Sequence, residues 1–218
     1  MVVGQQQAAV FQSILGGLWH VLMPLAQTGI YYFLVAVVFA AGGGKASLSF
    51  VMIMMGILHF ALFYHIASFA QPAIHGNASL LLQIKLEPSL LVAAGFVRSV
   101  RIWSVGIVIY FIFFFALGGT LGIKALAYPF LLLLLLLLGW VMSLLVSTAA
   151  VFVRDIERAL PILLQILMYA SPVIYPLSFY PDRYLQLLLL NPFASIFALF
   201  QWSILGAEID VWFPLFIV

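Results

Sequence analysis

The sequence predicts an all-α integral membrane protein with about six transmembrane helices, and two observations lead to this prediction. Of the 218 residues, 67% are hydrophobic and only 6% are charged, and the mean hydropathy is +1.27. A soluble domain carries roughly 25% charged residues, so lipid must surround most of this chain. The charged residues also leave long neutral runs, which are 1–44, 46–84, 102–123, 125–153, 159–181 and 184–207.

Each neutral run is long enough to hold a membrane-spanning helix. A helix needs about 20 apolar residues to cross the hydrocarbon core, and a charge at its centre costs roughly 2.5–3.5 kcal/mol. Strands of a membrane barrel would alternate in polarity over about ten residues, whereas Leu131–Leu138 does not alternate. We therefore expect one domain over 1–218, with helices at 13–41, 47–70, 102–121, 129–153 and 161–179, a re-entrant pair at 182–206, and the truncated start of a last helix at 211–218.

Proline and charge indicate where these helices bend, begin or end. Pro24 lies inside the first helix, where neighbours can satisfy the carbonyl group that it frees. Pro161 suits the first turn of the fifth helix, where its missing N–H would be unpaired anyway. Residues 78–101 form a charged stretch that we expect to connect the second and third helices. Its charged and proline residues are Lys85, Glu87, Pro88, Arg98 and Arg101.

The neutral run between Arg183 and Glu208 predicts a re-entrant segment. Asn191-Pro192 interrupts this run, and nine residues of helix cover only about 13 Å, which is too short to cross a membrane. We therefore expect two half-helices that dip into the membrane and return, so that Asp182 and Glu208 lie on one side. A single span kinked at Pro192 is the alternative, and it would place those two residues on opposite sides.

The distribution of Lys and Arg favours a cytoplasmic amino terminus, because the loops that would then face inward carry more of these residues. The inner loops would hold Lys85, Arg98, Arg101, Arg154 and Arg158, and the outer loops would hold Lys45, Lys124 and Arg183.

The sequence argues against several kinds of chemistry. It contains no cysteine, so disulfides and thiolate metal sites are unavailable to it. The net charge of +2 is too small to indicate nucleic-acid binding. The stretch 42–46 is not a phosphate-binding loop, since Phe39 and Ala46 stand where that motif requires Gly and Ser or Thr. His59 and His65 are six residues apart and point to different helix faces, which favours helix-packing hydrogen bonds over a shared metal site.

Four stretches, in order along the chain, resemble the permease subunits of type-two ABC exporters, in the branch that handles O-antigen, capsule and teichoic-acid polysaccharides. The clearest is 152–176, in which a charged turn precedes a helix that ends in Ser-Pro-Val-Ile-Tyr-Pro. Leu190-Asn191-Pro192-Phe193 is similar to the Asn-Pro step between that family's paired periplasmic half-helices. Residues 13–25 resemble the beginning of its first span, and 77–88 resemble its loop between helices two and three.

This resemblance implies a homodimeric permease in the bacterial cytoplasmic (inner) membrane that works with a separate ABC ATPase and exports a lipid-linked polysaccharide. ATP and Mg would bind the partner ATPase, so this chain would be a transport subunit without a cofactor or nucleotide site, and not an enzyme. Family members begin with a basic amphipathic helix and complete a sixth span, whereas residues 1–12 are neutral and the sequence stops at Val218. We expect a piece of a longer protein or a divergent member.

The charged turn at 154–158 is the first ATPase-coupling candidate that the resemblance implies. Asp155 with Arg158, and Arg154 with Glu157, stand three residues apart and can pair on a helix surface. A solvated turn that ends a hydrophobic helix is the alternative, and it explains the same charges.

The second coupling candidate is the loop that contains Lys85, Glu87 and Pro88, for which a plain interfacial loop is the alternative. Arg98 and Arg101 are three residues apart and share one helix face. We expect them to reach anionic lipid headgroups, and contact with a phosphate-bearing substrate is the alternative.

Aromatic side chains are candidates for the translocation path, because a sugar chain that crosses a membrane needs flat apolar surfaces with hydroxyl groups nearby. Packing against lipid is the alternative. The path candidates are Tyr31, Tyr32, Phe60, Phe63 and Tyr64, and the candidates that the resemblance implies in the re-entrant segment are Pro172, Tyr175, Pro176, Asn191 and Pro192.

Three other functions fit part of this pattern. An ABC permease for a drug or small lipid would share the architecture. A secondary transporter would place paired ionisable residues within its spans, where this chain has only histidines. A membrane-embedded glycosyl- or acyltransferase would need a cluster of carboxylates or histidines at a membrane face.

Overall fold

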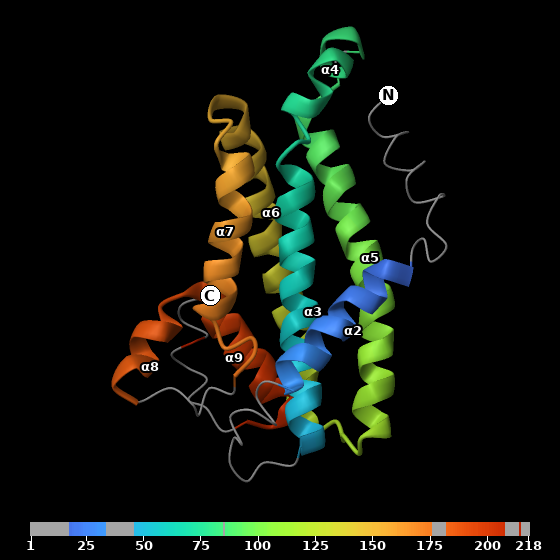
Figure 1. Cartoon of the computed structure of the whole chain (residues 1–218), viewed down its shortest axis with the longest axis vertical. Helices are drawn as coiled ribbons and strands as arrows, with labels where there is room; N and C mark the ends of the chain where they lie inside the picture. The colour runs from blue at the N-terminus through green and yellow to red at the C-terminus, as the bar shows by residue number, and fades with distance from the viewer. Residues whose placement is uncertain (1–17, 34–45, 85, 176–181, 208–213, 215–218) are drawn as a thin grey trace.

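The computed structural model describes residues 18–33, 46–84, 86–175, 182–207 and 214, and every regular element in these ranges is a helix (Figure 1). Three of these helices are long and apolar enough to cross a membrane, which confirms the predicted all-α polytopic membrane fold. The elements are α2 (Trp19–Phe33), α3 (Ala46–Ala70), η3 (His75–Asn77), α4 (Ala78–Ile84), α5 (Pro88–Ala116), η4 (Ile123–Ala127), α6 (Tyr128–Phe152), α7 (Ile156–Tyr169), α8 (Asp182–Leu189) and α9 (Pro192–Leu205).

α3 lies at the centre of the bundle and contacts α2, α5, α6, α7 and α9 (Figure 1). Of its most apolar stretch, 78% is buried inside the protein, against 28% for α5 and 33% for α6. Its sequence is apolar on all sides, which is typical of a helix surrounded by neighbours. The candidate sites described below are all arranged around α3.

α5 begins at Pro88 and not at residue 102, so the prediction of a third helix over 102–121 is corrected. Pro88 supplies the fixed φ that suits a first helical turn, and the helix continues through Arg98 and Arg101 to Ala116. Arg interrupts the hydropathy of the sequence but is a good helix former. The 29 residues of α5 extend roughly 43 Å, which exceeds the hydrocarbon core of about 30 Å.

α6 covers 128–152, one residue earlier at each end than the range 129–153 expected from the sequence. A tight connection joins it to α5. Gly118 adopts a left-handed φ of 85°, and the N–H of Gly119 donates to the carbonyl of Phe114 at 2.8 Å. This arrangement ends α5 in the manner of a glycine C-cap.

α7 begins and ends earlier than the predicted range 161–179, and Pro161 lies inside the helix instead of in its first turn. The helix starts early because the carbonyl of Asp155 already accepts the N–H of Ala159 at 2.9 Å. It ends at Tyr169, shortly before Pro172, which has no N–H and disfavours the helical conformation at the preceding residue.

α8 and α9 are short helices that meet near Asn191 and diverge from it (Figure 1). The side chain of Asn191 caps α9 by accepting the N–H of Phe193 at 3.1 Å. The hydroxyl of Ser195 donates to the carbonyl of Leu189 at 2.5 Å, and Leu189 shares a buried cluster with Ala198. Nine residues of continuous helix rise about 13 Å, so packing of Leu189 against Ala198 requires a sharp reversal and not one continuous span.

The break at Asn191 lies within the length of α3 and not at its end. The ring centroids of Phe193 and Phe63 are 4.3 Å apart, and those of Phe200 and His59 are 4.5 Å apart. α9 therefore runs antiparallel to α3 from a point within the length of that spanning helix. With 8 and 14 residues, α8 and α9 extend about 12 and 21 Å, which is the size expected of half-helices. Insertion of the pair into the bilayer stays a prediction.

Candidate functional site

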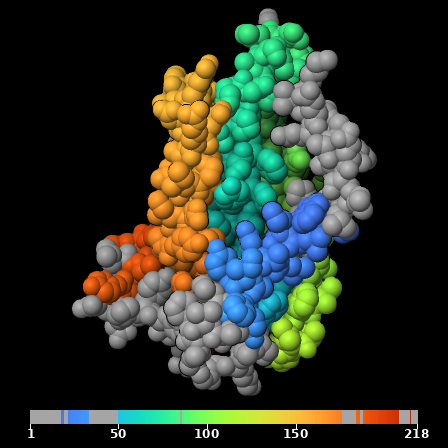
Figure 2. Space-filling model, in the orientation of Figure 1, coloured from blue at the N-terminus to red at the C-terminus, as the bar shows by residue number. Residues whose placement is uncertain are grey.

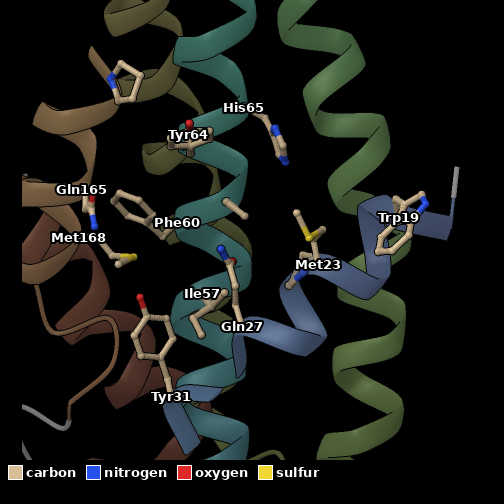
Figure 3. A pocket seen from close by; sticks show the side chains of 13 residues that line it. Trp19, Met23, Gln27, Tyr31, Ile57, Phe60, Tyr64, His65, Gln165 and Met168 are labelled. Atoms are coloured by element: carbon tan, nitrogen blue, oxygen red, sulfur yellow. The ribbon is translucent and has the colours of Figure 1, made fainter. Parts of the chain in front are cut away.

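A groove of about 630 Å³ lies between α2, α3 and α7 (Figure 3). In Figure 2, side chains of α3 remain visible between α7 and α2, the two helices that flank the groove. Figure 3 shows Tyr31 from α2, Phe60 and Tyr64 from α3, and Met168 from α7 around one space. The amide side chains of Gln27 and Gln165 also line it. The groove thus combines ring faces with hydrogen-bonding groups.

Three of the five aromatic residues expected in the translocation path line this groove: Tyr31, Phe60 and Tyr64. Phe63 is turned by about 100° from Tyr64 around the helix axis. It is fully buried, packs against Phe193 of α9 and does not line the groove.

The fifth residue, Tyr32, packs edge-on against Phe50 with ring centroids 5.4 Å apart. The sequence identified the aromatic face of α3, but residue type alone could not separate its groove side from its core side. At one end of the groove, the hydroxyl groups of Tyr31 and Tyr169 lie 3.3 Å apart and join α2 to the end of α7.

The turn that follows α7, residues 171–175, is held by a side chain from α9, and we call it the clamped turn. The amide Nε2 of Gln201 donates to the carbonyl of Pro172 at 2.8 Å and to that of Tyr175 at 3.3 Å. Gln201 is only 3% exposed. A buried amide is unfavourable in apolar surroundings unless its hydrogen bonds are formed, and here the turn supplies carbonyl acceptors.

Asn191 holds the start of the same turn from the break between α8 and α9. Its Nδ2 donates to the hydroxyl of Ser171 at 3.2 Å and to the carbonyl of Ala170 at 3.4 Å. Pro172, Tyr175, Asn191 and Pro192, which the sequence singled out, therefore belong to one assembly, and Pro176 lies outside the described residues. Gln201 was missed, although a lone amide in the apolar stretch of α9 was an available signal.

α3 has no side chain where the clamped turn crosses it. A Cβ atom at Gly56 would overlap the carbonyl group of Val173. The close approach of two backbones therefore requires glycine at this position. Val173 and Ile174 are buried against the core that α3 organises, so the clamped turn touches both α3 and α9.

The charged end of the bundle, residues 71–88 and 153–158, contains an ion pair that joins two loops. The Nε2 of His75 lies 2.7 Å from an Oε1 of Glu157, so the connection after α3 contacts the first turn of α7. Both side chains are partly exposed. Figure 1 shows α4 and the α6–α7 turn at the same end of the bundle.

The predicted pairs within the 154–158 turn are wrong for the described structure. Among the residues that the structure describes, Glu157 pairs with His75, and Arg154, Asp155 and Arg158 are exposed without an ion pair. Asp155 occupies the N-cap and Arg154 precedes it, so neither predicted pair lies wholly within the helix. The spacing rule for helix surfaces then does not apply.

The other coupling candidates lie at the corner between α4 and α5. Glu87 occupies the N-cap position of α5, with an extended backbone, and Pro88 is the first residue of that helix. Both are exposed, and Lys85 lies outside the described residues. His75, which the sequence did not single out, is the residue that connects this region to the charged turn.

His59 and His65 point to different sides of α3. His59 is fully buried. Its Nδ1 lies 2.7 Å from the carbonyl of Met55, and its Nε2 lies 2.8 Å from the hydroxyl of Tyr128. This hydrogen bond between α3 and α6 is of the helix-packing kind expected from the sequence. His65 lines the groove instead and stacks on Phe69.

The comparisons with known proteins bear on this geometry. No protein-family model matches the chain. Over 185 residues, the chain is 23% identical to the O-antigen export system permease protein RfbA of Klebsiella pneumoniae. The aligned region covers 84% of this chain and 70% of that protein. The relative is a transport subunit, and the apolar helices make this chain a membrane protein. The resemblance found in the sequence motifs is therefore confirmed: this chain is similar, at a distance, to the type-two ABC permeases of polysaccharide export.

Proposed function

We propose that this chain is the membrane-spanning permease subunit of an ABC exporter for a lipid-linked polysaccharide of the O-antigen, capsule or teichoic-acid type. It acts in the bacterial cytoplasmic membrane as a homodimer, together with a separate ATPase subunit that binds ATP and Mg. The observation that carries the proposal is the groove between α2, α3 and α7, where Tyr31, Phe60 and Tyr64 lie among amide side chains.

The chemistry of the groove supports a glycan as the transported group. Sugars offer apolar C–H faces and many hydroxyl groups. The aromatic rings of the groove can pack against the C–H faces, and the amides of Gln27 and Gln165 can bond to the hydroxyl groups. A drug or a small lipid would need few of these hydrogen bonds. The similarity to an O-antigen export permease supports the same class of substrate.

α7 supports a mechanism in which movement passes from the charged end to the half-helices. Its first turn contains Glu157, which pairs with His75. Its last residue, Tyr169, is followed closely by the clamped turn, which Asn191 and Gln201 hold. The 14 residues of α7, with Pro161 inside the helix, connect these two contacts directly. Displacement of the charged turn by an ATPase therefore shifts the clamped turn and α9 together.

Transport by this mechanism is a shift between populations and needs no covalent chemistry in this chain. ATP binding to the partner favours one arrangement of the charged ends, and the substrate favours the arrangement in which the groove is open to it. Each ligand can shift the equilibrium only by as much as it prefers one state over the other. The groove occupies one face of a single chain, so a second copy facing it would close the path.

The test is export by purified components. The chain is coexpressed with a candidate ABC ATPase subunit, and the complex is reconstituted into vesicles together with a radiolabelled lipid-linked glycan. We expect the two proteins to copurify and the glycan to move across the membrane only with ATP. The control is a complex whose ATPase carries a substitution in its phosphate-binding loop, which should assemble but not export.

Two results would contradict the proposal. Transport that continues with the inactive ATPase would indicate a secondary transporter. ATP-driven movement of a drug or small lipid, with no movement of the glycan, would indicate the other branch of ABC permeases.

A further inference from the structure

We propose that Arg98 and Arg101 on α5 bind the phosphate group of the transported molecule, while the groove holds its sugars. This inference rests on the proposed function and deepens it by naming a second part of the substrate site. The position of the two arginines, the ring stack that connects one of them to the groove, and the lack of a carboxylate partner carry it.

The two arginines lie level with the groove. A Cβ atom at Gly95 would be 3.3 Å from that of Phe69, and one at Gly106 would be 2.5 Å from Cδ1 of Leu58. Between these two contacts, the residue number rises by eleven along α5, from 95 to 106, and falls by eleven along α3, from 69 to 58. Arg98 and Arg101 therefore stand beside the turn of α3 at about 63–66, which includes Tyr64 and His65 of the groove.

A stack of three side chains connects Arg98 to the groove. The guanidinium carbon of Arg98 lies 4.8 Å from the ring centroid of Phe69, and the ring of His65 also stacks with that of Phe69, with centroids 5.8 Å apart. Figure 3 shows His65 directed from α3 toward α5, at the edge of the groove. A molecule in the groove that extends past His65 would therefore meet the two guanidinium groups.

Both arginines lack an acidic partner in the part of the chain that the structure describes. The ion pair found there joins His75 to Glu157, and no carboxylate of a described residue reaches Arg98 or Arg101. Arg101 is exposed and Arg98 is half-buried. They stand within the length of α3, which is long and apolar enough to span a membrane, and a contact between a guanidinium group and an anion is charge-assisted and therefore strong.

The chemistry identifies a phosphate or diphosphate between a hydrocarbon chain and a sugar chain. Arginine binds phosphate oxygens through two parallel N–H donors. A membrane phospholipid also offers a phosphate, but it has no sugars for the groove. A lipid-linked glycan satisfies the cations and the groove at once, with its hydrocarbon chain left in the bilayer.

Binding by the purified chain tests this inference without any ATPase. The full chain is placed in phosphatidylcholine nanodiscs, and native mass spectrometry measures binding of a long-chain polyprenyl diphosphate, of the corresponding polyprenol, and of phosphatidylglycerol. We expect tighter binding of the diphosphate than of either other lipid. Arg101→Gln should weaken diphosphate binding about tenfold, as expected for loss of a charge-assisted contact, and should leave polyprenol binding unchanged.

Two matched variants complete the experiment. Arg101→Lys keeps the charge and should retain most of the affinity. Lys124→Gln removes one positive charge at the other end of α5 and should change nothing. Arg98→Gln should weaken binding similarly, and the thermal stability of that variant must be measured because Arg98 also packs on Phe69.

Unchanged diphosphate binding in both Arg98→Gln and Arg101→Gln would overturn the inference. Equal binding of phosphatidylglycerol would also overturn it, because it would assign the arginines to ordinary lipid. If either of these binding results were found and the complex still exported the glycan with ATP, only this inference would be contradicted and the proposed function would be unaffected. Normal arginine-dependent binding without ATP-driven export would instead contradict the proposed function alone.

Discussion

The side-chain amide of Gln201 donates to the carbonyl of Pro172 at 2.8 Å, although the two residues stand 29 positions apart in the sequence. This contact ties the middle of α9 to the turn that ends α7. Pro172 is itself buried, so its carbonyl has no access to water. The hydrogen bond therefore fixes how the half-helix pair sits against the spanning helices.

Replacement of Gln201 by leucine should destabilise the protein. Leucine has a similar size but leaves the carbonyl of Pro172 buried and unpaired, and the expected loss is about 1–3 kcal/mol of unfolding free energy. Titration with SDS in mixed micelles measures it. Gln83→Leu is the control, because Gln83 is exposed on α4. Equal effects of the two substitutions would show that the clamp does not stabilise the fold.

Gly56→Ala should be among the most damaging small substitutions in the chain. The added methyl group would overlap the backbone carbonyl of Val173, which cannot move without displacing the clamped turn. Overpacking of this kind costs about 1–3 kcal/mol. Gly29→Ala on α2 is the matched control, since no atom lies within 4 Å of its new Cβ. It should be neutral, or stabilise by up to about 1 kcal/mol. A stable Gly56→Ala protein would mean that α3 and the turn do not touch.

The buried hydrogen bond between His59 and Tyr128 should show energetic coupling. The atoms Nε2 and Oη lie 2.8 Å apart between α3 and α6, and such pairs in membrane proteins contribute about 0.6 kcal/mol on average and up to about 1.7. A double-mutant cycle with His59→Phe and Tyr128→Phe measures the coupling from unfolding free energies. Strict additivity of the two substitutions would show that the groups do not interact.

The sequence predicted the membrane class and the apolar helices well, because hydropathy reports directly on burial in lipid. α6 shows this clearly, since its ends fall within one residue of the expected range. The start of α5 was wrong because Arg98 and Arg101 lower the hydropathy without breaking the backbone. Hydropathy marks where a helix leaves the hydrocarbon, and only caps and prolines mark where it ends.

The parts of the site that were not predicted depend on contacts between distant segments. The ion pair of His75 with Glu157 joins two loops, and neither residue has a local pattern that reveals its partner. The same holds for Gln201 and the clamped turn. Motif spacing could group residues along one helix, but it could not show which side of α3 faces α9 and which faces the groove.

The ion pair between His75 and Glu157 should matter more for coupling than for stability. Partly exposed pairs contribute about 0–1 kcal/mol, so Glu157→Gln should barely change the midpoint of thermal unfolding. If the pair transmits movement, the same variant should export less glycan for each ATP hydrolysed. His75→Gln should have the same effect, and the double variant should be no worse than either. Additive losses in the double variant would show that the residues act separately, and normal export in all three would contradict a role in transmission.

The groove face of α3 offers the sharpest test of the translocation path. Tyr64 lines the groove and is partly open to it, whereas Tyr32 packs on Phe50 outside it. Tyr64→Leu removes a ring face and a hydroxyl from the proposed contact with sugars, and it should lower glycan export several-fold while the ATPase still copurifies. Tyr32→Leu removes the same groups outside the groove and should leave export near the unsubstituted level once any loss of folded protein is corrected. Equal export by the two variants would contradict the path. Selective loss with Tyr64→Leu would place the sugars beside α3, because both substitutions remove the same groups but only Tyr64 lines the groove.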